Sequence, residues 1–113
     1  MGGGGGGCTV ADLAILQGET TPLPDGIPSF SVQVINLCGR AQGPCSAASD
    51  IHVSCGWFAS AKLVNPHLFR RLRFNDCIVN DSKALRGGQS ITFEYANSFQ
   101  YPLTISSAKT GCH

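Results

Sequence analysis

Six cysteines are the residues of this chain best suited to do chemistry, because thiols bind zinc, form disulfides or act as nucleophiles. They are Cys8, Cys38, Cys45, Cys55, Cys77 and Cys112. No two of them form a C-x-x-C pair, so the spacing lacks the arrangement that brings two thiolates to one zinc ion. An even number of cysteines in a short chain instead favours three disulfides, which need an oxidising compartment. We therefore expect a secreted, extracellular protein without a metal site.

The positions of turn-forming residues suggest how the cysteines pair. Cys38 and Cys45 flank the sequence GRAQGP, so we expect these two to bond across one short connection. Cys8 with Cys55, and Cys77 with Cys112, would then tie the two ends of the chain to its body. In the chain-entropy model such cross-links contribute roughly 2.5 to 4 kcal/mol each. Because total stability is typically about 5–15 kcal/mol, we expect the disulfides to supply a large part of it.

The other nucleophiles and acids do not form a catalytic arrangement. His52 lies three residues before Cys55, but in a strand that odd spacing puts the two side chains on opposite faces. No G-x-S-x-G elbow, P-loop or dinucleotide fingerprint occurs. The carboxylates lie mainly in expected turns or on solvent faces: Asp12, Glu19, Asp25, Asp50, Asp76, Asp81 and Glu94. We expect neither an enzyme nor a bound cofactor.

Alternating apolar and polar side chains predict the strands that position these residues. The alternation has the strand period of two at 30–34, 51–55 and 91–95. Further short strands are expected at 12–17, 77–79 and 101–107. Turn formers such as those of PLPDGIP separate the strands. This spacing predicts an all-β fold: a small, disulfide-stapled antiparallel β-sandwich with one short helical turn.

The helical turn is expected after Asn65, which can cap it, and Pro66, which suits its first position. It would carry four positive or titratable side chains: His67, Arg70, Arg71 and Arg73. The net charge of the chain is only +1. No global field therefore attracts nucleic acid or an anionic membrane, and electrostatic recognition must come from a local patch. The plain alternative is an ordinary solvated turn.

Composition and length bound the domain and its location. Apolar residues make up 42% and charged residues 13% of the chain, which excludes a charge-rich disordered protein and favours one domain over 8–113. The glycine-rich start at 1–7 is expected to be a flexible coil. It has no charged n-region and no apolar h-region, so we expect that a secretion signal is missing from this sequence. No apolar run approaches the roughly 20 residues of a membrane span, so we expect no membrane insertion.

Four longer motifs resemble the plant tapetum determinant family: IHVSCGWF, LVNPHLFRRL, DCIVND and YANSFQYPL. The resemblance extends from about Cys8 to Cys112 and includes all six cysteines. It implies a small secreted protein ligand that is bound by the ectodomain of a leucine-rich-repeat receptor kinase. It further implies a role in cell fate in the anther, where such ligands specify the nourishing tapetal layer.

A receptor ligand would use positive side chains to meet an acidic surface and apolar side chains as anchors. The candidate cations are Lys62, His67, Arg70, Arg71 and Arg73, and the candidate anchors are Trp57, Phe58 and Phe69. The alternative is an extracellular carbohydrate-binding module, in which Trp57, Tyr95 and Tyr101 would stack on sugar rings. Binding to cell-wall polysaccharides separates the two hypotheses.

Asn80, Asp81 and Ser82 form an N-x-S sequon. One interpretation is a glycan at Asn80 on an exposed loop of a secreted protein. The other is an unmodified turn, and the sequence favours neither.

Overall fold

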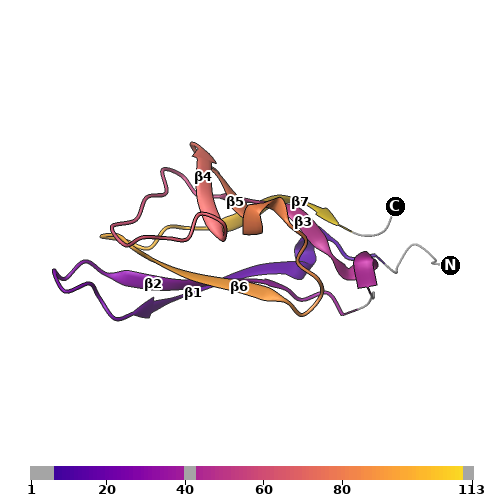
Figure 1. Cartoon of the computed structure of the whole chain (residues 1–113), viewed down its shortest axis with the longest axis horizontal. Coiled ribbons are helices and arrows are strands. Elements are labelled where there is room, and N and C mark those ends of the chain that lie inside the picture. Colours follow the sequence, from indigo (N-terminus) through magenta and orange to yellow (C-terminus); the bar gives the residue numbers. More distant parts are fainter. Residues whose placement is uncertain (1–6, 40–42, 111–113) are drawn as a thin grey trace.

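The computed structural model describes residues 7–39 and 43–110 and shows two antiparallel sheets packed face to face (Figure 1). Residues 1–6 of the glycine-rich start, and Cys112, lie outside the described residues. The first sheet has the order β1 (Leu13–Thr20), β2 (Ser29–Asn36), β6 (Ser90–Ala96). The second has the order β4 (Phe69–Arg73), β5 (Asp76–Val79), β3 (Ala48–Ser54), β7 (Thr104–Thr110). Three short 3₁₀ turns accompany the strands: η2 (Val10–Asp12) precedes β1, η3 (Gly43–Ser46) lies between β2 and β3, and η4 (Asn80–Ser82) lies between β5 and β6.

The predicted all-β antiparallel sandwich is confirmed, and its core follows the alternation in the sequence. Val32 and Val34 of β2 and Tyr95 of β6 are at most 1% exposed, and they face Ile51 and Val53 of β3, which are also fully buried. Each such side chain contributes about 1.5–3 kcal/mol when it leaves water. The core therefore holds the two sheets together.

The region after Pro66 differs from the prediction. Asn65 caps a turn as expected: its Oδ1 accepts a hydrogen bond from the His67 N–H at 2.9 Å, and its carbonyl accepts from the Leu68 N–H at 3.0 Å. The turn ends at Leu68, however, and the arginines lie on strand β4 instead of a helical turn. The reason is Phe69, which is 2% exposed and stacks on Phe93 of the opposite sheet with ring centroids 4.5 Å apart. Because this ring is buried between the sheets, the segment that begins at Phe69 pairs with β5 as a strand.

All three predicted cysteine pairings are wrong. The structure bonds Cys8 to Cys38 and Cys55 to Cys77, with Cα atoms 5.8 and 6.1 Å apart. Cys45 is disulfide-bonded as well, so every cysteine among the described residues is oxidised. The prediction of disulfides is therefore supported, although the connectivity is not the predicted one.

Strand pairing, and not loop length, decides which cysteines meet. Val53 pairs with Cys77 in the β3–β5 ladder, so Cys55, just beyond the end of β3, arrives beside its partner. Leu13 pairs with Asn36 where β1 and β2 meet, so Cys8 and Cys38 flank the same end of that ladder. The expected disulfide between Cys38 and Cys45 was inferred from the turn-forming sequence GRAQGP alone and took no account of these long-range contacts.

A candidate interaction surface around Trp57

Three side chains from two loops and an edge strand form an exposed cluster, which we call the Trp57 ledge: Trp57, Arg71 and Phe74. Trp57 is 65% and Phe74 55% exposed, and their ring centroids lie 4.8 Å apart. The guanidinium carbon of Arg71 stands 5.0 Å from the centroid of the indole ring. At this distance the cation is attracted to the negative face of the ring. The ledge is thus an exposed surface of two rings, tilted by 49° to each other, with a positive charge held beside the indole.

Two hydrogen bonds between neighbouring turns, one to a side chain and one to the backbone, hold Trp57 against Phe74. Gly56, with φ 57°, turns the chain after β3, and Asn75, with φ 59°, turns it between β4 and β5. The Gly56 N–H donates to Asn75 Oδ1 at 2.9 Å, and the Asn75 N–H donates to the Gly56 carbonyl at 2.7 Å. The Cys55–Cys77 disulfide joins the same two segments. We call this arrangement the Gly56–Asn75 clamp, and it fixes the two rings side by side.

The guanidinium of Arg71 is held in place by a hydrogen bond to the backbone of Phe58, a residue of the core. Its Nε–H donates to the carbonyl of Phe58 at 3.2 Å, and the Phe58 ring is buried against Phe69, Tyr95 and Tyr101. This hydrogen bond uses one edge of the guanidinium and leaves the two terminal nitrogens without a carboxylate partner among residues 7–39 and 43–110. Arg71 is therefore a fixed, uncompensated positive charge.

The other predicted cations are each paired with an acid of the same chain. Arg70 and His67 both contact Asp81, the latter through Nδ1 at 2.9 Å. Arg73 donates to Asp76 at 2.8 Å, and Lys62 is paired with Glu94. Exposed pairs of this kind add little stability, but they cancel much of the positive patch that the sequence suggested. Of the predicted cluster, Arg71 alone keeps its charge free for a partner within the described part of the chain.

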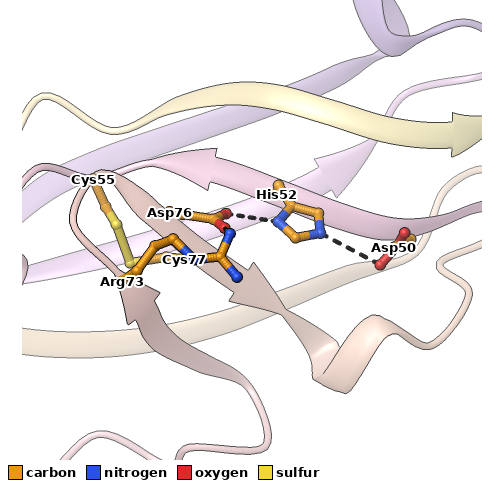
Figure 2. Close-up of polar contacts among 6 residues, drawn as sticks. All are labelled: Asp50, His52, Cys55, Arg73, Asp76 and Cys77. Carbon is orange, nitrogen blue, oxygen red and sulfur yellow. Dashed lines mark hydrogen bonds and ion pairs between the residues drawn. A yellow bond between two sulfur atoms is a disulfide. The ribbon is translucent and has the colours of Figure 1, made fainter.

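The pairs of Asp76 form a short network on the outer side of the second sheet (Figure 2). Asp76 contacts Nδ1 of His52 at 2.7 Å, and Nε2 of His52 lies 3.4 Å from Asp50. Cys55, by contrast, is 2% exposed and bonded to Cys77. His52 and Cys55 thus lie apart, as their odd spacing predicted, and Cys55 offers no thiolate.

Asp81 should titrate far below an ordinary aspartate. Hydrogen bonds from Arg70 and His67 lower the pKa of its carboxyl from 3.8 to about 2. Because the native pKa is the lower one, the stability contributed by ionised Asp81 is fully present above about pH 4 and is lost as pH falls towards 2. An NMR titration should give a midpoint near the lower value, and Arg70→Gln should raise it. An unchanged midpoint in that variant would contradict the contact.

The aromatic residues proposed as anchors divide into core and surface. Phe58 is 7% and Phe69 2% exposed, so neither ring is available to a partner. Tyr95 and Tyr101, proposed to stack on sugars, are also buried; the Tyr95 hydroxyl donates to Gln17 and accepts from the Tyr101 N–H. Of the aromatic residues that the sequence suggested for binding, Trp57 is the one with an exposed ring. Phe74 was not predicted as a surface residue because its exposure depends on the β4–β5 turn. Its position next to Asn75, a residue that favours turns, could have indicated an exposed ring.

Asn80 lies where β5 ends, in η4, and its side chain is half-buried. Asn80, Asp81 and Ser82 all have positive φ, of 55°, 57° and 68°. The asparagine amide donates only a long hydrogen bond, 3.5 Å, to the Lys83 carbonyl. Glycosylation of this sequon stays a prediction.

None of the helical turns in the described residues has the length and apolar character that crossing a membrane requires.

The comparison with protein families finds one matching family model, described as "Tapetum determinant 1, C-terminal", over residues 9–112. Two relatives are the Arabidopsis thaliana "TPD1 protein homolog 1", 52% identical over 100 residues, and the Oryza sativa "TPD1 protein homolog 1A", 49% identical over 106 residues. The matches cover 88% and 90% of this chain but 54% and 46% of the relatives. The chain therefore spans about half the length of these proteins. No solved structure matches.

Proposed function

The chain belongs to the tapetum determinant family, and from this premise we propose that it is a secreted protein ligand for the ectodomain of a leucine-rich-repeat receptor kinase. In that role it would specify cell fate in the tapetum of the anther, a role that fits the name of the family. The observation that carries the proposal is the family match over residues 9–112. The protein would act by binding, without catalysis.

Two structural features support this proposal. The disulfides are typical of small proteins that fold in the secretory pathway, where the environment is oxidising. The Trp57 ledge combines exposed aromatic rings with arginine, which are residue types enriched in the energetically important parts of protein interfaces. A small oxidised domain with such a surface is suited to bind another protein outside the cell.

A binding screen tests the proposal. The disulfide-intact chain, immobilised, is exposed to a panel of leucine-rich-repeat receptor kinase ectodomains and, in parallel, to cell-wall polysaccharides. We expect saturable binding to at least one ectodomain and none to the polysaccharides. The reduced chain serves as the control, because it should lose the fold and with it the binding. Binding to a polysaccharide alone would instead identify a carbohydrate-binding module.

A further inference from the structure

We propose that the receptor docks on the Trp57 ledge, and that it offers a carboxylate flanked by apolar groups to Arg71, Trp57 and Phe74. This inference rests on the proposed function and names the surface and the chemistry by which that function would work. It also revises the expectation that the whole arginine cluster takes part. Three arguments, from charge, geometry and exposure, support it.

The charge argument concerns the difference between Arg71 and its neighbours. Arg70 and Arg73, on the same strand, already pair with Asp81 and Asp76. Asp76 also contacts His52 (Figure 2), so this acid is occupied by two groups. The terminal nitrogens of Arg71 have no such partner among the described residues, and its Nε is held by the Phe58 carbonyl. A free guanidinium fork is suited to a bidentate pair with a carboxylate.

The geometric argument is that the ledge is formed before any partner arrives. The Gly56–Asn75 clamp, the Cys55–Cys77 disulfide and the Arg71–Phe58 hydrogen bond fix the three side chains. A partner therefore pays little conformational entropy to order them, which is the main way in which preorganisation raises affinity. The ledge also includes Arg71 of β4, which is an edge strand: among the described residues, only β5 pairs with it.

The exposure argument concerns the aromatic rings. Trp57 and Phe74 are 65% and 55% exposed while they contact each other. Among the ring contacts of residues 7–39 and 43–110, this is the pair in which both rings are exposed; Phe99, for example, packs on the buried Tyr101. Tryptophan, phenylalanine and arginine are residue types enriched at protein interfaces, and the neighbouring positive charge favours an acidic protein surface over a neutral sugar.

The test uses ledge variants matched to controls of similar exposure or charge. The ledge variants are Trp57→Ala, Phe74→Ala and Arg71→Gln. The control for Phe74→Ala is Phe99→Ala, since the two rings are 55% and 56% exposed. The control for Arg71→Gln is Lys109→Gln, which removes one exposed positive charge from β7 at the opposite edge of the sheet. Circular dichroism and melting temperature establish that each variant is folded.

We expect Trp57→Ala and Arg71→Gln to raise the Kd for the receptor ectodomain by roughly 30-fold or more, as for interface hot spots. Phe74→Ala should raise it by roughly 10-fold, and the two controls by less than about 3-fold. Arg71→Gln should also flatten the dependence of Kd on salt concentration, because it removes the charge that the partner's carboxylate would meet.

A second measurement does not depend on variants. Trp57 is the single tryptophan of the chain, so labelling with 5-fluorotryptophan gives one ¹⁹F resonance that reports on the ledge. Adding the unlabelled ectodomain should shift and broaden this resonance at the stoichiometry of binding. Binding without any change in the resonance, or ledge variants that bind as tightly as the parent chain, would overturn the docking site and leave the proposed function intact. A parent chain that binds no ectodomain would overturn both.

Discussion

Replacing Val53 with Asp should leave the protein unfolded. Val53 is fully buried in β3, where it pairs with Cys77 of β5 on one side and Ile105 of β7 on the other. A carboxylate there would lose its hydration without a charged partner, which costs at least several kcal/mol. That loss is comparable with the whole stability of a small domain, typically about 5–15 kcal/mol. Far-UV circular dichroism and urea denaturation measure the effect.

The matched control is Thr92→Asp, because Thr92 lies on β6 with its side chain exposed. This variant should keep the spectrum of the parent chain, and its free energy of unfolding should change by less than about 0.5 kcal/mol, as is usual for surface substitutions. A folded Val53→Asp protein with a normal melting temperature would show that β3 is not in the centre of the core.

Removing the Cys55–Cys77 disulfide should produce the second largest effect. With a sequence separation of 22, the chain-entropy model gives a loss of about 3 kcal/mol for the double variant Cys55→Ser, Cys77→Ser. The substitution also releases the segments that carry Trp57 and Phe74. We therefore expect a lower midpoint of urea unfolding and, in the protein that remains folded, a changed ¹⁹F resonance from labelled Trp57.

The Cys8–Cys38 disulfide supplies the control for this experiment. Its sequence separation is 30, and since closure entropy grows only slowly with loop length, Cys8→Ser, Cys38→Ser should cost a similar free energy. It lies at the end of the β1–β2 ladder, outside the ledge, so the Trp57 resonance should stay unchanged. Equal changes in that resonance in both double variants would show that Cys55–Cys77 has no special part in forming the ledge.

Most strands were predictable because their side chains alternate between a buried and an exposed face. The alternation around Val32, Ile51 and Phe93 required no knowledge of neighbours, since the strand period of two is a local property. Strand β4 was not predictable in the same way. Pro66 starts a turn, and only the burial of Phe69 against Phe93 shows that the chain becomes a strand directly afterwards.

The disulfide pairing failed for a related physical reason. Turn formers between Cys38 and Cys45 show that the chain bends there, but they do not show which strand ends lie side by side. Cys55 meets Cys77 because β3 pairs with β5, and Cys8 meets Cys38 because β1 pairs with β2. Pairing between distant strands depends on the packing of the whole sandwich, so several pairings were compatible with the local pattern.

By itself, the sequence determined the all-β class, the oxidised state of the cysteines that the structure describes, and the family. These properties depend on composition, local periodicity and several long motifs within one chain. Only the tertiary structure decided which residues form the candidate site. The three arginines of β4 are the same residue type and cannot be told apart in the sequence. In the structure, however, Arg70 contacts Asp81 and Arg73 contacts Asp76, while Arg71 lies on Trp57. Likewise Trp57 and Phe58 are neighbours, but one ring is exposed and the other buried. The physical reason is that charge compensation and burial are set by residues distant in the chain, which only folding brings together.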